Sequence, residues 1–422
     1  MTELIAELDT WLDANWDPQL TVRQWWERLG PSGWAAPHWP VTAYGRGLTN
    51  AETGQVRQRL RQRKVLGPPA GLGLLLAGPT IYTHGTPEQV ERFLPDILCG
   101  RTAWCQLFSE PVAGSDLAGL QTRAVRDGDE WRVTGQKVWT SSGHISDLGM
   151  LIARTDPDAP KRRGITYFLV DMRQPGIDIR PLREMTGRSL FNEVFLDDVV
   201  VRDADIVGGQ GHGWAVTNTT LAFERAGLGA GSSGGAEGSA FPGTVVGHLD
   251  RLAGEFTEPP SERRAPSLSV DPMALVELAR LEGATGDPLL RQRLAQLWIE
   301  HQIGRYMALR GRDLRAAGTD LPGMANMAKL RMSSMFRNAR EIGLGLLGAR
   351  GMLHDYDDVA PVDERDAQEI RMTSLALWSP GPSIYGGTDQ VQRNILAERV
   401  LGLPRDGVDD STIPFKDLPR NV

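Results

Sequence analysis

The residues between Trp104 and Gly143 combine side-chain types and spacings that could hold a flat polar ligand. Gly114 has no Cβ, so the backbone there can approach a ligand closely. Trp139 offers a flat apolar surface against which a ring could pack. Four residues contribute hydroxyl and free N–H groups at expected strand ends: Ser109, Ser115, Thr140 and Ser141. Each feature alone is ordinary turn chemistry, and together they indicate a surface that binds a polar planar ring.

The elements that position these residues change their period along the chain. Residues 1–103 place apolar side chains at helical spacing, with charged residues between them. From 104 to 213 the period becomes two, in short runs separated by Gly, Pro and Asp, which predicts a small antiparallel β-domain. Helices resume at 214 and continue to 422. The sequence therefore predicts a mainly α-helical protein with a central β-domain, divided into 1–103, 104–213 and 214–422.

A low-complexity segment interrupts the last of these domains. Gly229–Ala240 reads G-A-G-S-S-G-G-A-E-G-S-A, and prolines continue the irregular stretch to about residue 271. The segment contains a formal G-x-G-x-x-G pattern, but this follows a predicted helix and not a strand, so we reject a dinucleotide site. We expect a flexible insertion over about 229–271, with Gly229–Ala240 mobile because it cannot bury enough apolar surface.

Length and composition limit the class of protein. The chain has 422 residues, more than the ~250–300 at which single cores stop growing, so several domains are expected. A formal net charge of −7 argues against nucleic acid as the main partner. No apolar run approaches the ~18 residues of a membrane span. The acidic, amphipathic start also lacks the basic-then-apolar layout of a signal peptide.

Other titratable residues indicate little additional chemistry. Cys99 and Cys105 are the only cysteines, which excludes a disulfide scaffold and indicates a reducing, cytoplasmic location. The seven histidines show no metal-ligand spacing, so no metal site is expected. A basic run from Arg57 to Lys64 could meet the phosphates of a nucleotide ligand, and a solvated helix face is the alternative.

Two long motifs carry a resemblance to a known family. The first is F-S-E-P-V-A-G-S-D-L-A-G at residues 108–119, followed by G-Q-K-V-W-T-S at 135–141. The second is I-Y-G-G-T-D-Q-V-Q-R-N-I-L-A-E-R-V-L-G-L-P-R at 384–405. In this order they resemble the acyl-CoA dehydrogenases, over most of the chain. The resemblance implies a helical N-terminal domain, a β-barrel or β-sandwich middle domain that cradles FAD, and a C-terminal helical bundle.

The resemblance implies the α,β-dehydrogenation of an acyl-CoA thioester to the trans-2-enoyl-CoA. In that reaction a carboxylate removes the α-proton while a hydride leaves the β-carbon for flavin N5. Many family members carry the Glu directly after the Tyr of a Y-E-G-T motif, where this chain has Gly386. Others carry it on the first helix of the C-terminal domain, directly before an Arg, which matches Glu224 and Arg225.

The residues around Glu224 support the second position. Trp214 and Leu221 lie seven apart on one predicted helix face, and Glu224 follows three residues later on the same side. A carboxylate on an apolar stripe is costly unless it is paired or used in chemistry. Glu224 is therefore interpreted as the catalytic base, and a salt bridge with Arg225 or another cation is the alternative.

The resemblance also carries the family's binding residues onto this chain. Residues implied to bind FAD are Gln106, Phe108, Ser109, Gly114, Ser115, Trp139, Thr140, Ser141, Arg291, Gln302, Thr388 and Gln390. Residues implied to contact the substrate are Arg225, Ser115, Tyr385 and Gly386. Arg291 stands eleven residues before Gln302, as does the family Arg that reaches the FAD pyrophosphate of a neighbouring subunit. The Phe-Gly that usually follows is Leu294-Ala295, and the usual Gln before a Gly-Gly turn is Gly345.

These implications define the expected function and its alternatives. We expect an FAD-dependent acyl-CoA dehydrogenase of lipid metabolism, in fatty acid β-oxidation, that passes electrons to an electron-transfer flavoprotein or a similar acceptor. We expect a homo-oligomer, a dimer or tetramer, or a heterotetramer. One alternative is a non-catalytic or half-site subunit of a hetero-oligomer, and another is a flavin oxidase or monooxygenase on the same scaffold. Gly386 and the insertion indicate a bulky, branched or ring-bearing acyl group.

Overall fold

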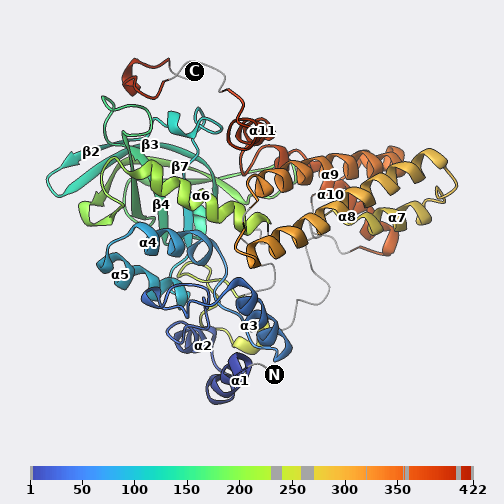
Figure 1. Ribbon diagram of the computed structural model, residues 1–422, viewed down its shortest axis with the longest axis horizontal. Helices are drawn as coiled ribbons and strands as arrows, with labels where there is room; N and C mark the ends of the chain where they lie inside the picture. The colour runs from blue at the N-terminus through green and yellow to red at the C-terminus, as the bar shows by residue number, and fades with distance from the viewer. Residues whose placement is uncertain are drawn as a thin grey trace. The chain divides into compact units, whose positions relative to one another are not determined.

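The structure is a computed structural model that forms two compact units (Figure 1). It describes residues 3–229, 240–257, 270–319, 321–354, 356, 361–404 and 410–419. The first unit comprises Met1–Leu182, Ser189–Glu262 and Val408–Val422. The second comprises Arg183–Arg188 and Arg263–Gly407.

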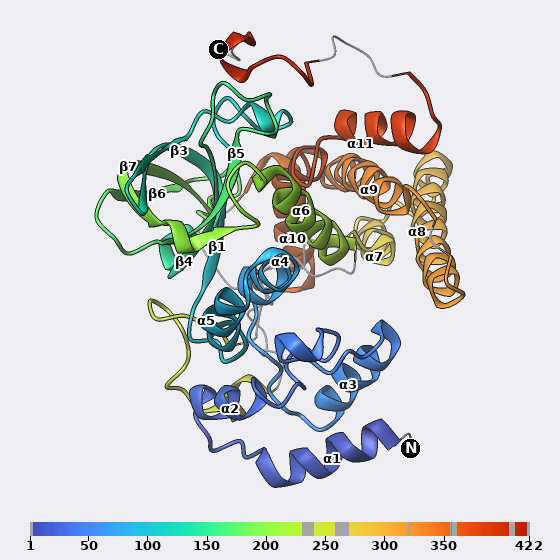
Figure 2. The ribbon, with the colours of Figure 1, turned by 60° about the vertical axis from the view of Figure 1, so that its left-hand side comes forward.

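The first unit begins with five α-helices. They are α1 (Glu3–Asn15), α2 (Val22–Leu29), α3 (Asn50–Gln62), α4 (Gly78–His84) and α5 (Pro87–Leu98). Three of them start at a capping box, in which a threonine side chain accepts from a backbone N–H of the first turn: Thr21, Thr49 and Thr86. Figures 1 and 2 show α4 and α5 between the sheet and the first three helices. The predicted helical region ahead of the β-domain is confirmed.

An eight-stranded sheet follows the five helices. Its strands are β1 (Trp104–Leu107), β2 (Arg123–Asp127), β3 (Glu130–Ser141), β4 (Leu148–Arg154), β5 (Ile165–Asp171), β6 (Ile177–Leu182), β7 (Phe191–Arg202) and β8 (Ile206–Val207). Their order is β6-β7-β3-β2-β4-β5-β8, and β1 pairs with β4. The antiparallel prediction is wrong for two pairs, since β1 and β2 both run parallel to β4. Side-chain alternation has the same period in both pairings, so it could not distinguish them.

Both faces of the central strands are buried. On β4, Met150 and Ile152 belong to the core shared with the helices, whereas Leu151 and Ala153 belong to a second core on the opposite face. Successive side chains of a strand point to opposite faces, so a strand covered on both sides is a continuous apolar run. The sheet therefore carries the helices on one face and closes a core of its own on the other.

Helix α6 (Gly213–Gly229) packs against β5 and α4 in the first unit (Figure 2). It matches the predicted helix over 214–228. Thr220 on this helix lies 2.9 Å from the hydroxyl of Thr80 and 3.2 Å from the hydroxyl of Tyr167, in a buried polar contact. These bonds fix the rotation of α6 against the sheet and α4, and therefore the direction in which its later side chains point.

Residues 240–257 correct the prediction of a flexible insertion over about 229–271. Val22 N donates to the carbonyl of Arg251, and Ala253 N donates to the carbonyl of Leu20, both at 2.8 Å. Ala253 is also fully buried. The prediction is wrong for this part because its backbone pairs with the start of α2. The predicted mobile stretch, Gly229–Ala240, lies outside the described residues except for its two end residues.

The basic run on α3 contributes to the fold. Arg59 Nε donates to Asp9 of α1 at 2.8 Å, and Arg63 reaches Asp9 at 3.2 Å and Asp13 at 2.6 Å. The hydrogen bond from Arg59 is the main cause that lowers the pKa of Asp9. Part of the run therefore holds α1 against α3, a role that neither interpretation of the sequence included.

The second unit is a bundle of helices. They are α7 (Pro272–Leu281), α8 (Pro288–Ala316), α9 (Met324–Leu347), α10 (Glu364–Trp378) and α11 (Asp389–Ile395). The core of this unit draws on four of them through Leu278, Leu297, Ala339 and Met372. None of the helices in the described ranges combines the length and apolar composition that a membrane span requires. The predicted class, mainly α with a central β-domain, is confirmed.

Candidate active site

A bulge in β3 decides where the ring of Trp139 points. The register between β3 and β7 shifts between Lys137 and Thr140, so the side-chain alternation slips there. Trp139 has a φ of +62°, which is uncommon for a bulky residue. It is 60% exposed, and its ring lies edge-on to that of Phe191 with 5.9 Å between centroids. The flat apolar surface that the sequence predicts is therefore accessible.

Thr140, the next residue, is fully buried. Its hydroxyl has no hydrogen-bond partner within the described ranges. Asn192 on β7 donates to the carbonyl of Thr140 at 2.9 Å and lies 3.1 Å from Nδ1 of His144. Sequence reasoning missed Asn192, and its only signal is a polar residue at an inward position of an apolar strand. Ser141, by contrast, is half-buried.

A buried ion pair fixes the loop 108–122, which we call the cradle loop. Lys137 on β3 is completely buried, and its Nζ donates to Oε1 of Glu110 at 2.8 Å. Glu110 in turn accepts from the backbone N–H groups of Gln121 at 2.6 Å and Thr122 at 3.0 Å. One carboxylate therefore joins the two ends of the loop to each other and to the strand that carries Trp139.

The same pair explains how the chain tolerates a buried charge. Lys137 Nζ also donates to the carbonyl of Phe108 at 3.1 Å. Burial raises the pKa of Glu110, but the charge and hydrogen bond of Lys137, together with the bonds from Thr122 and Gln121, outweigh it and bring the pKa below its usual range. Burial lowers the pKa of Lys137. The sequence signal that we missed was a lysine in phase with the inward residues Trp131 and Val133.

The backbone at Gly114 is open to its surroundings. Apart from its two chain neighbours, no described atom lies within 4 Å of the place that a Cβ on Gly114 would occupy, so internal packing does not require glycine there. Gly114 is also not among the glycines with positive φ. The close approach of a ligand to Gly114 therefore stays a prediction from the sequence. Gly114 and Ser115 are both exposed, and Ser109 is tied to β3 by Val138 N, which donates to its carbonyl at 2.9 Å.

Glu224 lies against the first strand of the sheet. Gln106 on β1 donates from Nε2 to Oε2 of Glu224 at 3.3 Å, within the first unit. Burial raises the pKa of Glu224, and the smaller effects of Gln106 and of the Arg225 charge oppose it. A half-buried carboxylate with a raised pKa beside a strand end is suited to accept a proton near neutral pH.

The second unit holds the residues of the other predicted motif. Gly386 and Gly387 have φ values of +62° and +83°, so the chain turns sharply there. Gln392 donates from Nε2 to the carbonyl of Gly386 at 2.7 Å. Thr388 caps α11 by accepting from Val391 N at 3.2 Å. These bonds fix the turn over 384–392, which we call the 384–392 turn.

Asp389 anchors this turn to α9. It accepts from Lys329 at 3.2 Å and from Arg337 at 2.9 Å. Burial raises the pKa of Asp389, but hydrogen bonds from Ser333, Arg337 and Lys329 outweigh it and lower the pKa. Sequence reasoning missed Asp389. The neighbouring predicted residues differ in exposure, with Gln390 exposed and Tyr385 half-buried.

Arg291 and Gln302 lie on one face of α8. Eleven residues span about three helical turns, so the two side chains point the same way. Arg291 is exposed and donates to the carbonyl of Thr285 at 3.4 Å, and Gln302 accepts from Arg305 at 3.4 Å. Nearby Leu294 is buried in the core of the second unit. Its departure from the family pattern therefore serves helix packing.

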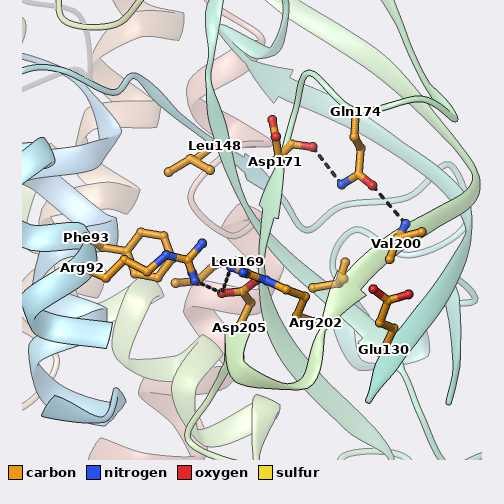
Figure 3. A pocket seen from close by; sticks show the side chains of 11 residues that line it. Arg92, Phe93, Glu130, Leu148, Leu169, Asp171, Gln174, Val200, Arg202 and Asp205 are labelled. Atoms are coloured by element: carbon orange, nitrogen blue, oxygen red, sulfur yellow. Dashed lines mark hydrogen bonds and ion pairs between the residues drawn. The ribbon is translucent and has the colours of Figure 1, made fainter. Parts of the chain in front are cut away.

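A cavity of about 310 Å³ in the first unit lies away from these residues (Figure 3). Arg92 and Arg202 converge on Asp205, at 2.5 and 3.0 Å, while Phe93 and Leu169 supply apolar walls. None of the predicted site residues lines it. Arg92 and Arg202 therefore both pair with Asp205 in this cavity.

Three family descriptions match this chain and together cover most of it. The acyl-CoA dehydrogenase N-terminal domain matches residues 2–101, the middle domain matches 105–199 and the C-terminal domain matches 275–401. Acyl-CoA dehydrogenase IpdE1 of Mycobacterium tuberculosis is 37% identical over 385 residues, which are 91% of this chain and 88% of IpdE1. The chain belongs to the acyl-CoA dehydrogenase family, which is a family of flavoproteins.

Two further relatives differ in how much of them the chain covers. Acyl-CoA dehydrogenase FadE34 of Mycobacterium tuberculosis is 41% identical over 377 residues, 89% of this chain but 46% of FadE34. The chain thus spans about half the length of that relative. Among solved structures, the Tcur3481-Tcur3483 steroid ACAD matches with a TM-score of 0.68 and 26% identity, over 96% of this chain and 97% of that chain.

Proposed function

We propose that this chain catalyses the FAD-dependent α,β-dehydrogenation of an acyl-CoA thioester to the trans-2-enoyl-CoA. The observation that carries the proposal is the contact at 3.3 Å between Gln106 and Glu224. Gln106 lies on the strand expected to face the flavin, and Glu224 is the expected base, 118 residues later in the sequence. The hydrogen bond between these two residues supports a common site, in which the base must lie within reach of the proton that it abstracts.

Glu224 performs the proton transfer in this proposal. The amide of Gln106 holds Oε2, which leaves Oε1 as the atom that accepts the α-proton. A raised pKa increases the basicity of the carboxylate toward the weakly acidic α-carbon. FAD, when bound, supplies the acceptor for the hydride that leaves the β-carbon.

The residues present fit a flavin. Trp139 offers an accessible ring, the backbone at Gly114 is open to close approach, and a buried ion pair holds the cradle loop beside β3. In the first unit the proposed FAD contacts are Gln106, Phe108, Ser109, Gly114, Ser115, Trp139, Thr140 and Ser141. In the second unit they are Arg291, Gln302, Thr388 and Gln390. Thr140 is buried, and its hydroxyl is the polar group there that has no hydrogen-bond partner within the described ranges.

We extend the proposal to a bulky, ring-bearing acyl group. Gly386 has no side chain where many family members carry a glutamate, and one similar solved structure is named a steroid ACAD. Arg225, Ser115 and Tyr385 are the further proposed substrate contacts. A panel of acyl-CoA thioesters, scored by flavin bleaching, tests this extension: faster bleaching by straight short chains than by ring-bearing ones would contradict it.

The experiment that tests the main proposal is a single change at the base. Glu224→Gln keeps the size and hydrogen bonding of the side chain but cannot take a proton. The rate of flavin bleaching in a single turnover should fall by ~10²–10⁴, with flavin content unchanged. Glu88→Gln, at an exposed site on α5, is the matched control and should bleach normally. Near-normal bleaching in Glu224→Gln would remove Glu224 from the mechanism.

A half-site role in a hetero-oligomer is the second candidate function. The chain spans 46% of the length of FadE34, and the similar steroid ACAD has a name that joins two components. Gly386, Gly345 and Leu294-Ala295 depart from the family pattern in the second unit. The purified chain alone should be yellow, with one FAD per chain, if it is complete. Flavin binding that appears only with a second, co-expressed chain would favour the half-site role.

The remaining predictions stay proposals. They are an electron-transfer flavoprotein or similar acceptor, a homo-oligomer or heterotetramer, a role in fatty acid β-oxidation, and a cytoplasmic location. The described Cys99 and Cys105 are free and buried, which supports a reducing compartment. The division into 1–103, 104–213 and 214–422 also stays a proposal.

A further inference from the structure

Arg154, at the end of β4, is a buried cation whose side chain binds backbone carbonyl groups of the cradle loop. Its guanidinium donates to the carbonyl of Ala118 at 2.7 Å and to that of Leu120 at 3.3 Å. Its own backbone N–H donates to the carbonyl of Thr122 at 2.8 Å. The arginine is 5% exposed, so these carbonyls replace most of its contact with water. Two carbonyls of the loop therefore depend on the side chain of Arg154, and a third is held by its backbone N–H.

The ring of Phe415 covers the face of this guanidinium. The Cζ atom of Arg154 lies 3.3 Å from the centroid of the Phe415 ring, the geometry of a cation–π contact. A guanidinium forms hydrogen bonds through its edge and stacks through its face, so the carbonyl bonds and the ring contact are compatible. Burial lowers the pKa of Arg154 to about 10, so the side chain still carries its charge at neutral pH.

Phe415 belongs to the segment 410–419, which is fixed to the first unit by its backbone. Phe415 N donates to the carbonyl of Ala159 at 3.0 Å, and Lys416 N donates to the carbonyl of Pro157 at 3.0 Å. The Lys416 side chain also pairs with Asp158 at 2.5 Å. These bonds place the ring at a set position.

Lys161, between β4 and β5, links the segment 410–419 to the cradle loop. Lys161 pairs with Asp116 of the cradle loop at 2.5 Å and lies 3.8 Å from Asp410 of the segment. A crevice of about 20 Å³ marks the seam between the two, and Gln121 and Phe415 are among the residues that line it. Ring stacking and ion pairs therefore join two parts of the chain that are some 300 residues apart in the sequence.

We propose that the segment 410–419 is a working part of the flavin cradle, and that Phe415 positions Arg154 to hold the cradle loop. The inference rests on the proposed FAD site. Loss of the ring exposes one face of Arg154 to water and weakens its bonds to Ala118 and Leu120. The loop that carries Gly114 and Ser115 then samples more conformations, so flavin binding must bear the cost of ordering it.

Two substitutions distinguish the aromatic face of Phe415 from the apolar volume that its side chain fills. Phe415→Leu keeps an apolar cover but removes the π face, and Phe415→Tyr keeps the face. The Kd for FAD should rise roughly 2- to 30-fold in Phe415→Leu, the range of a cation–π contact. It should stay within about twofold of the unchanged protein in Phe415→Tyr. Phe256→Leu is the matched control, because Phe256 stacks on Arg251 at 4.7 Å and belongs to neither the cradle loop nor segment 410–419.

Hydrogen exchange on the flavin-free protein supplies a second readout. The amides of residues 119–122 all donate hydrogen bonds within the cradle loop, so their exchange reports how firmly it is held. These amides should exchange faster in Phe415→Leu than in the unchanged protein. Their exchange rates should stay the same in Phe256→Leu. An unchanged protein that binds no FAD overturns the proposed function and this inference together. An unchanged protein that binds FAD, with Phe415→Leu binding it equally well, overturns the inference alone, whatever the exchange rates.

Discussion

The cradle loop and the 384–392 turn are both held by charged side chains, but the charges are in different surroundings. In the first unit, Lys137 is completely buried and Arg154 is 5% exposed. In the second unit, Asp389 and its partner Lys329 are largely buried, but its other partner, Arg337, has a side chain that is 37% exposed. Water can replace part of the lost interaction at an exposed partner but not at a buried one. The same kind of anchor should therefore matter more in the first unit.

The two regions also differ in how they depart from the family pattern. The motifs over 108–119 and 135–141 are intact. In the second unit Gly386 replaces the usual glutamate, and the buried Leu294 stands where the family has Phe. We infer that the intact region, held by buried charges, carries the reaction, and that the second unit has been free to change around a substrate.

The largest effect is expected from the buried ion pair. Lys137→Met leaves Glu110 buried without its cation, which should lower the free energy of unfolding by about 3–5 kcal/mol and abolish stable flavin binding. The double change Lys137→Met, Glu110→Gln should recover part of that loss. Urea unfolding followed by tryptophan fluorescence measures both. Lys161→Met, which removes a partly exposed pair with Asp116, is the control and should cost less than about 1 kcal/mol. An equal loss of unfolding free energy in Lys137→Met and Lys161→Met would contradict the claim that a buried charge matters more than an exposed one.

A smaller effect is expected from the anchor of the second unit. Asp389→Asn removes the charge that Lys329 and Arg337 share, which should cost about 1.5–3 kcal/mol. Because Arg337 can regain water, this loss should stay below that of Lys137→Met. Hydrogen exchange over α11 measures it, with Glu341→Gln at an exposed ion pair as the control. If Asp389→Asn proved the more damaging change, the second unit would be the more rigid part of the site.

The pH dependence of flavin bleaching tests which unit supplies the base. The base must be ionised, so the rate should fall about tenfold per pH unit below its pKa. Burial raises the pKa of Glu224, so the midpoint should lie above the ordinary value of about 4.3 for a glutamate. Asp389 has a lowered pKa, and a base there would move the midpoint below the ordinary range of an aspartate. Rate profiles of the unchanged protein between pH 4 and 9 distinguish the two.

The smallest effect on stability is expected from removing a threonine helix cap, and the chain offers one such cap in each unit. Thr388→Ala removes the acceptor for Val391 N at the start of α11, and Thr86→Ala removes the acceptor for Gln89 N at the start of α5. Each should cost about 1 kcal/mol of stability. Only Thr388→Ala should also raise the Kd for FAD, since Thr388 is a proposed contact. A rise of equal size in Thr86→Ala would show that the effect on flavin comes from stability alone.

The sequence by itself determined the order of elements and the family, and it supplied the candidate residues of the proposed site. Helical and strand periods show in the spacing of apolar residues within short windows of the sequence. The helical region at the N-terminus, the central β-domain and the helix over 214–228 were therefore all predicted. The motif at 108–119 and the Glu-Arg pair at Glu224 depend only on local order; the motif indicated the family, and the pair indicated the proposed base. Contacts within a few residues of each other are fixed by local chemistry.

The tertiary structure alone decided which distant residues meet. It paired Glu110 with Lys137, placed Phe415 on Arg154, ran β1 parallel to β4 and bound residues 240–257 to the start of α2. Each of these contacts joins segments separated by tens to hundreds of residues. Such contacts depend on the path of the whole chain and on the burial that it creates, and no local period encodes that path.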